Sequence, residues 1–111
     1  MGASQTHAVR EGLEMHALGW IDPSSPTSAW DAAQVRRLAR QLGYALHWAD
    51  PSSVLGLAEQ VEASGADAVI LPSSAHVDAI TLDRLLAVVD VECAAPRVSF
   101  ARWTLFGGLH R

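Results

Sequence analysis

Short apolar segments alternate with segments of helical periodicity along most of this 111-residue chain, and this alternation constrains the fold more than any other feature. Residues 68–71, Ala-Val-Ile-Leu, form a continuous apolar run that is typical of a strand covered on both faces of a parallel sheet. Further strands are expected at residues 16–21, 44–48 and 91–94. The alternation predicts an α/β fold: one open, mostly parallel sheet with right-handed crossovers, as the middle of three layers.

Three helices are expected between these strands. The first begins at Ser28, which fits a capping box with Asp31, and ends before Gly43. The second begins at Asp50, as a cap followed by a proline, and ends before Gly65. Apolar stripes mark the buried faces of the second and third helices: Val54, Leu57, Ala58, Val61, Leu82, Leu85, Leu86 and Val89.

The length of the chain allows one ordinary hydrophobic core, so a single domain is expected. Residues 1–14 are polar and mixed, and we interpret them as a flexible N-terminal arm. Residues 15–95 hold the α/β pattern. Residues 96–111 are half apolar but lose the long period, which indicates either an edge strand or a tail that docks on a neighbour.

Composition excludes several classes of function. A net charge of −4 is unlike that of proteins that wrap a phosphate backbone, so nucleic acid is not an expected partner. No apolar run approaches the roughly 18 residues of a membrane span, and the first dozen residues lack the pattern of a secretion signal, so a cytoplasmic protein without membrane contact is expected.

Cys93 is the single cysteine and lysine is absent, which excludes a cysteine-based zinc site and Schiff-base chemistry. The histidines lack metal-ligand spacing, and we expect neither metal nor cofactor.

Serines gather at the carboxyl ends of the expected strands, where open parallel sheets bind their ligands. These ends read Asp22-Pro23-Ser24-Ser25, Asp50-Pro51-Ser52-Ser53 and Pro72-Ser73-Ser74-Ala75-His76. The candidate ligand-binding residues are Asp22, Ser24, Ser25, Asp50, Ser73 and Ser74. Capping and turn formation account for the same residue types, and no glycine-rich turn of the usual dinucleotide site is present.

A catalytic interpretation of the same region would use Ser24 as nucleophile and His76 as its base. Both residues follow strands and would lie near one edge of the sheet. Their spacing does not require a triad, because a lone histidine also serves as a capping or core residue.

Candidate interface residues lie away from the strand ends. Trp20 and Trp48 fall in expected strands and should pack inside, whereas Trp30 and Trp103 suit an interface. The remaining candidates, which lie on the first helix or in the tail, are Arg36, Arg37, Arg40 and Phe106. These residues favour self-association or a protein partner.

Residues 16–95 carry three motifs in a defined order. The first strand ends in Trp20-Ile21-Asp22-Pro23-Ser24, the next helix contains AAQVRRLARQLGY, and the third strand runs into VILPSSAHVDA. In this layout the segment resembles the N-terminal catalytic domain of the serine recombinases, the resolvase and invertase family, whose first motif has the form Tyr-x-Arg-Val-Ser.

The resemblance implies a resolvase-like fold, with Ser24 in place of the serine that attacks a DNA phosphodiester. Asp22 stands where the family has an arginine, and Ser74, Ala75 and Asp78 stand where it has an aspartate and two arginines. Replacing these arginines removes the positive field that phosphoryl chemistry requires, and the aspartates repel a phosphate. The resemblance therefore implies a domain without the family's catalysis.

The expected function is that of a catalytically inactive resolvase-like domain that acts as a protein-interaction or regulatory module, as a homodimer or with another protein. The alternative is a sensor that binds a small ligand or nucleotide at the serine-rich strand ends. An active hydrolase or recombinase with a Ser24 nucleophile is the third hypothesis.

Overall fold

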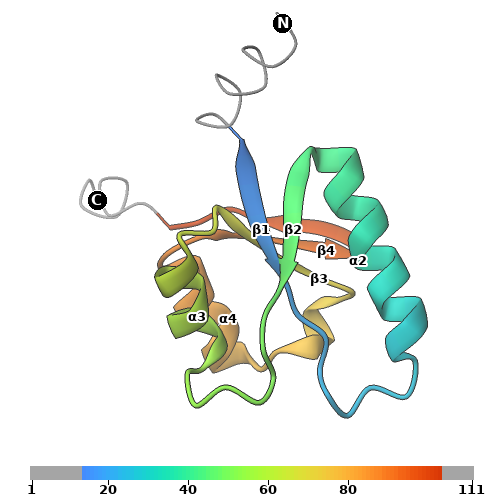
Figure 1. Cartoon of the computed structure of the whole chain (residues 1–111), viewed down its shortest axis with the longest axis horizontal. Helices are drawn as coiled ribbons and strands as arrows, with labels where there is room; N and C mark the ends of the chain where they lie inside the picture. The colour runs from blue at the N-terminus through green and yellow to red at the C-terminus, as the bar shows by residue number, and fades with distance from the viewer. Residues whose placement is uncertain (1–13, 104–111) are drawn as a thin grey trace, which may run out of the picture.

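A five-stranded sheet forms the middle layer of the protein, whose computed structural model describes residues 14–103 (Figure 1). The strand order is β2-β1-β3-β4-β5, in which β1 to β4 are parallel and β5 is antiparallel to β4. The elements are β1 (Met15–Gly19), α2 (Ser28–Leu42), β2 (Tyr44–Trp48), α3 (Leu57–Ser64), β3 (Ala68–Leu71), the short 3₁₀ helix η1 (Ser74–His76), α4 (Ala79–Leu86), β4 (Asp90–Ala94) and β5 (Arg97–Phe100). The predicted α/β fold with a mostly parallel sheet is confirmed.

Two apolar cores lie on opposite faces of the sheet. On one face α2 places Val35, Leu38 and Ala39 against Ile70 of β3. On the other face the buried side chains of α3 and α4 meet alternate residues of the strands. Helix α2 therefore covers one face, and α3 and α4 cover the other (Figure 1). All four residues of β3 are buried, as their continuous apolar run predicted.

The strand order reverses at β1. From β1 the chain crosses through α2 to β2 on one side, and then through α3 to β3 on the other side. The carboxyl ends of β1 and β3 are therefore neighbours at the point of reversal, where open α/β sheets form their binding crevice. The register places Gly19 opposite both Trp48 of β2 and Ile70 of β3.

Close packing against Trp48 explains why residue 19 is a glycine. A Cβ atom at this position would lie 2.8 Å from two ring carbons of Trp48, so a side chain would force the indole away. The expectation that Trp20 and Trp48 both pack within strands is corrected by the structure. Trp20 follows β1 and packs partly against the α3–α4 core, whereas Trp48 ends β2 and is 42% exposed.

One predicted helix cap and one predicted helix start differ from the structure. The capping box of Ser28 and Asp31 does not form, because Thr27 is the N-cap and Asp31 lies buried in contacts with other hydroxyls. Helix α3 begins at Leu57, with Gly56 as N-cap, rather than at Asp50. Val54 therefore lies before the helix and is fully exposed, whereas Leu57 and Val61 are buried as predicted.

The segment after β4 contributes an edge strand, one of the two alternatives expected for residues 96–111. Strand β5 pairs with β4, so the sheet continues past residue 95. Residues 1–13 of the arm expected at residues 1–14, and Phe106, lie outside the described residues. Within residues 14–103, no helix has the length and apolar character needed to cross a membrane.

Candidate functional site

A pocket of about 560 Å³ lies at the carboxyl edge of the sheet, at the point where the strand order reverses. The loops after β1, β2 and β3, together with the starts of α3 and α4, supply its walls. The polar and aromatic side chains of the lining are Trp20, Asp22, Asp50, Ser53, Gln60, His76, Asp78 and Thr81. A neighbouring pocket of about 210 Å³ shares Asp22 and His76 with it and is also lined by Ser24 and Ser25.

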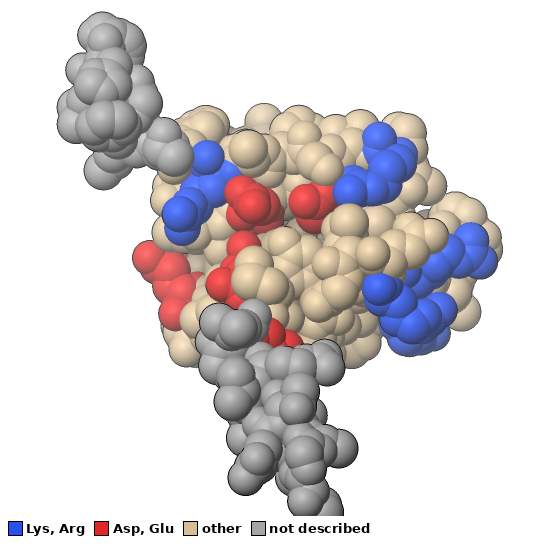
Figure 2. All heavy atoms as spheres, turned by 90° about the horizontal axis from the view of Figure 1, so that it is seen from above, with Lys and Arg blue, Asp and Glu red and all other residues tan. Residues whose placement is uncertain are grey.

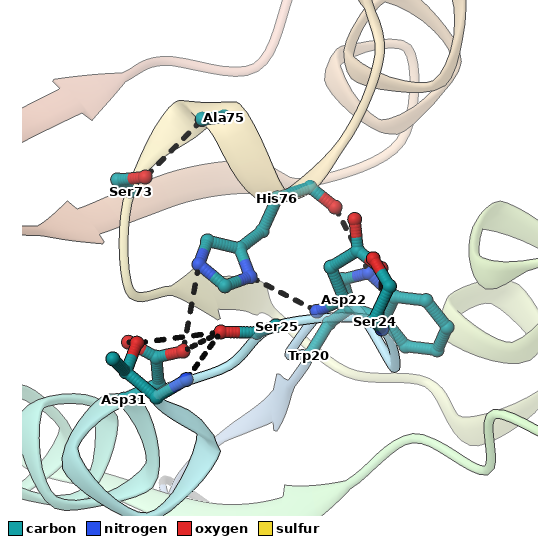
Figure 3. Close-up of polar contacts among 9 residues, drawn as sticks. Trp20, Asp22, Ser24, Ser25, Asp31, Ser73, Ala75 and His76 are labelled. Atoms are coloured by element: carbon teal, nitrogen blue, oxygen red, sulfur yellow. Dashed lines mark hydrogen bonds and ion pairs between the residues drawn. The ribbon is translucent and has the colours of Figure 1, made fainter.

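His76 connects the loop after β3 to the turn after β1 (Figure 3). Its Nδ1 accepts a hydrogen bond of 2.9 Å from the backbone N–H of Asp22. Its carbonyl oxygen accepts one of 3.2 Å from Nε1–H of Trp20. Because these contacts join residues more than fifty positions apart, they depend on β1 and β3 being neighbours in the sheet.

Asp31 of α2 lies on the other side of the imidazole (Figure 3). It is only 3% exposed, and its Oδ2 lies 3.7 Å from Nε2 of His76. Its carboxylate accepts hydrogen bonds from the hydroxyls of Ser25 at 2.6 Å and Thr27 at 3.2 Å. A buried carboxylate is costly without such partners, and these donors and the nearby imidazole compensate its loss of water.

Three aspartates of the pocket wall hold local structure through one oxygen each. Oδ1 of Asp22 accepts from Ser24, Oδ1 of Asp50 accepts from Ser52, and Oδ1 of Asp78 caps α4 by accepting from the Thr81 amide at 2.7 Å. Hydrogen bonds from the backbone and hydroxyl of Ser24 lower the pKa of Asp22, with a smaller contribution from His76. The hydroxyl and backbone of Ser52 lower the pKa of Asp50, and the backbone N–H of Thr81, followed by its hydroxyl, lowers the pKa of Asp78. All three are therefore carboxylates at neutral pH.

The pocket lining carries negative charge, because it contains three aspartates and none of its residues is an arginine or lysine. Arg36, Arg37 and Arg40 are exposed on α2 instead. Figure 2, which looks onto the amino ends of β1 and β2, shows arginine atoms gathered on the α2 side of the molecule. The pocket is acidic, and an anion placed in it would meet repulsion rather than a counter-charge.

The structure brings together four of the six residues predicted to bind a ligand. Asp22 and Asp50 line the larger pocket, and Ser24 and Ser25 line the smaller one. Ser73 and Ser74 line neither pocket. Ser73 accepts a hydrogen bond from the Ala75 amide as the cap of η1, and Ser74 is the first residue of that helix.

Ser24 and His76 are not placed as a nucleophile and its base. The Ser24 hydroxyl donates to Oδ1 of Asp22 at 2.8 Å, and Nδ1 of His76 is occupied by the Asp22 amide. The other imidazole nitrogen faces Asp31. Cys93 offers no nucleophile here either, because it is buried on β4 and burial raises the pKa of its thiol.

The predicted interface tryptophans are both exposed. Trp30 on α2 and Trp103 after β5 are each 55% exposed. The backbone N–H of Trp103 donates to the carbonyl of Leu86 at the end of α4, which ties this segment to the domain. These positions leave both rings accessible.

Sequence reasoning missed Asp31, Gln60 and Trp20 as members of the site. For Asp31 a signal existed: Val35 and Leu38 follow at i+4 and i+7, so the carboxylate falls on the buried stripe of its helix. A charge on a buried stripe indicates a partner inside the fold. For Gln60 and Trp20 no local pattern distinguishes them from surface or core residues.

Within the described residues, no three side chains among His, Cys, Asp and Glu are placed to hold a metal ion. The pocket aspartates are thus spread around the wall rather than gathered at one point. No family model, curated protein or solved structure matches this chain.

Proposed function

We propose that this chain is a non-catalytic, cytoplasmic binding module on a resolvase-like scaffold, and that its ligand is a small organic cation held in the 560 Å³ pocket. One observation carries the proposal: Asp22, Asp50 and Asp78 line the pocket, and no arginine or lysine does. The single cysteine is a free thiol, which fits a reducing compartment.

The aspartates retain acceptor capacity toward a ligand. Among residues 14–103, the hydrogen bonds to the side chains of Asp22 and Asp50 all end on Oδ1, so Oδ2 of each remains available to a ligand. An ammonium or guanidinium group donates several hydrogen bonds and carries the matching charge. Trp20 adds an aromatic ring to the wall, a surface to which organic cations are attracted.

The same lining disfavours the phosphate chemistry of the recombinases. Asp22 occupies the position at which the family has an arginine, and Asp78 replaces another. Ionised aspartates repel a phosphodiester, and the Ser24 hydroxyl has a carboxylate as its acceptor rather than an imidazole. A nucleotide ligand is disfavoured for the same reason.

Protein interaction is the second candidate function, and the exposure of Trp30 favours it. This indole lies on the helix that also exposes Arg36, Arg37 and Arg40, so α2 presents an aromatic and cationic surface. Such a surface suits an acidic protein partner or a second copy of the chain. Sedimentation of the full chain and of Trp30→Ser tests the homodimer: a dimer that the substitution dissociates supports it, and a monomer at all concentrations excludes it.

Binding of cations is tested by thermal unfolding and calorimetry of the full chain with putrescine, spermidine and agmatine, and with inorganic phosphate and AMP as anions. The cations are expected to raise Tm through mass action, with an affinity that falls as salt increases. Asp50→Asn and Asp78→Asn keep an oxygen for the turn and the cap, and each should weaken binding by about 3–10-fold. Asp83→Asn, an exposed position of α4 outside the pocket lining, is the matched control. Stabilisation by phosphate or AMP with no response to the cations would overturn the proposal.

A further inference from the structure

His76 joins two loops of the pocket through a hydrogen bond that exists in only one protonation state of its ring. We propose that His76 is a proton-operated latch: a proton added to Nδ1 breaks the bond from the Asp22 amide, leaves the bond from Trp20 Nε1–H to the His76 carbonyl as the remaining hydrogen bond of His76 to this segment, and weakens cation binding. The effect on the ligand rests on the proposed function, whereas the latch itself does not.

The contacts of the ring assign its protons. A backbone N–H can only donate, so Nδ1, at 2.9 Å from the Asp22 nitrogen, must present its lone pair. The single proton of the neutral imidazole is therefore on Nε2, the nitrogen that faces Asp31 Oδ2 at 3.7 Å. In the neutral state Nδ1 accepts a hydrogen bond, whereas Nε2–H lies near the Asp31 carboxylate but beyond hydrogen-bond distance.

Acidification adds the second proton to Nδ1, because Nε2 already carries the first. Two N–H groups would then point at each other across 2.9 Å, and the Asp22 amide would lose its acceptor. Two carboxylates attract the imidazolium that forms: Asp31 from α2 and Asp22 from the turn after β1. Asp78, in the loop of His76, is the other carboxylate of this wall. Since Ser25 still ties the turn to Asp31 and Trp20 still bonds the His76 carbonyl, the displacement is confined to the Asp22 end of the turn.

Protonation of His76 acts on the pocket in two ways, and both lower the affinity for a cation. Asp22 and His76 both line it, so displacement of Asp22 alters the position of one of its three carboxylates. The imidazolium also places a positive charge beside the ligand cation. Cation affinity is therefore expected to fall when His76 takes up its second proton.

An internal control for the latch lies in the next loop. The backbone N–H of Asp50 donates to Oε1 of Gln60 at 2.8 Å, in the same place in its turn as the Asp22 bond to His76. An amide oxygen does not titrate in this range. The Asp50 contact should therefore persist at every pH at which the Asp22 contact is lost.

The test of the latch is a ¹⁵N NMR titration of the full chain from about pH 8 to about pH 5, which follows the His76 ring nitrogens and the Asp22 and Asp50 amides. We expect the Nε2–H form at high pH, an Asp22 amide shift that changes together with the His76 ring, and an Asp50 amide that does not follow it. An Nδ1–H form at high pH, or an Asp22 amide indifferent to the ring, would overturn the latch. His76→Gln offers a non-titrating acceptor and should abolish the Asp22 response; the titration of the unaltered chain decides the matter if that variant does not fold.

Coupling to the ligand is tested with putrescine as probe, by its affinity at both ends of the pH range for the unaltered chain and for His76→Gln. The unaltered chain should lose at least about 5-fold more affinity on acidification than the variant, a difference of the size that one nearby charge produces. Equal losses would overturn the coupling. If putrescine binds at neither pH while the NMR titration behaves as expected, the proposed function fails and the latch stands.

Discussion

Residues 22–25 and 50–53 have the same sequence, Asp-Pro-Ser-Ser, and each follows a strand of the parallel sheet. They form the same turn. In both, Oδ1 of the aspartate accepts from the amide and hydroxyl of the first serine, at 2.9 and 2.8 Å in one turn and 2.9 and 2.7 Å in the other. In both, the amide of the second serine donates to the aspartate carbonyl, at 2.9 and 3.2 Å.

The two turns differ in the residue that accepts a hydrogen bond from the aspartate amide. The Asp22 amide meets a histidine from the loop after β3, whereas the Asp50 amide meets Gln60 from the helix that directly follows its own loop. Gln60 also donates to the carbonyls of Asp50 and Leu55, so it closes the second loop on itself. The Asp22 turn is therefore bonded to a histidine from another crossover, whereas the Asp50 turn is bonded to a neutral glutamine from the adjacent helix.

The second serines differ in the same way. The Ser25 hydroxyl donates to the buried carboxylate of Asp31, whereas the Ser53 hydroxyl accepts from the Leu55 amide within its own loop. Identical local sequences therefore form a network across the domain in one case and a self-contained loop in the other. Four substitution experiments test this difference, from the largest expected effect to the smallest.

Asp31→Ala should lower the free energy of unfolding by about 2–3 kcal/mol, because the partly buried hydroxyl of Ser25 loses its charged acceptor and exposed Thr27 loses a second bond. Glu59→Ala is the control from the second crossover, where an exposed carboxylate near Arg84 should contribute less than about 1 kcal/mol. Urea denaturation measures both variants. Equal losses would show that the first turn has no special connection to the interior.

Ser25→Ala and Ser53→Ala compare the second serine of each turn directly. Loss of a hydroxyl that donates to a buried carboxylate should cost about 1.5–2 kcal/mol, and loss of the hydroxyl that serves the exposed loop about 0.5 kcal/mol. The same denaturation experiment gives both values. A larger cost at Ser53 than at Ser25 would contradict the assignment of the network to the first turn.

Ser24→Ala and Ser52→Ala compare the first serines, whose contacts are the same in the two turns. Both variants should lose a small and equal amount of stability, less than Ser25→Ala loses, because each removes one hydroxyl bond to a solvent-accessible carboxylate. Thermal unfolding of the pair measures the difference. A loss specific to Ser24 would indicate that this hydroxyl has a role outside its turn.

The carboxyls of Asp22 and Asp50 should both titrate below the ordinary aspartate pKa of about 3.9, since bonds from Ser24 and Ser52 favour the ionised form. A depressed pKa in the folded state contributes stability above the unfolded pKa, and that contribution is lost as pH falls through the folded value. The effect therefore lies in the acid range, below the ordinary aspartate pKa. Carboxyl ¹³C shifts measure it, and in Ser24→Ala and Ser52→Ala the corresponding pKa should return toward the ordinary value. A pKa at or above that value in the unaltered chain would contradict the turn geometry.

The secondary structure was predictable wherever side-chain periodicity is strong. Helix α2 and strand β2 have the predicted bounds, and glycines in the left-handed conformation end α2 and α3 at Gly43 and Gly65 as expected. The prediction that α3 begins at Asp50 was wrong, and the contacts of Asp50 show why. The Asp50 side chain has two possible uses, as a helix cap or in an aspartate turn, and its bonds to Ser52 commit it to the turn.

The candidate site was predictable in part. Topological reasoning correctly placed Asp22 and Asp50 at one edge of the sheet, because carboxyl ends of parallel strands share an edge. The same reasoning also selected Ser73 and Ser74, which do not line the pocket. Ser73 caps η1, and Ser74 is the exposed first residue of that helix. The pairing of Asp31 with His76 needed the crossing of α2 over the sheet, which no local spacing encodes.

The amino-acid sequence by itself determined the two Asp-Pro-Ser-Ser turns, since every group that closes them lies within four consecutive residues and is the same in both copies. Only the tertiary structure decided what each turn is joined to. The bond between Asp22 and His76 spans 54 positions and requires β1 to lie beside β3, whereas β2 lies at the edge of the sheet and its turn finds a partner ten positions away. Strand order depends on the packing of the whole chain, and it gives one copy of the turn a partner that can take up a proton and the other a partner that cannot.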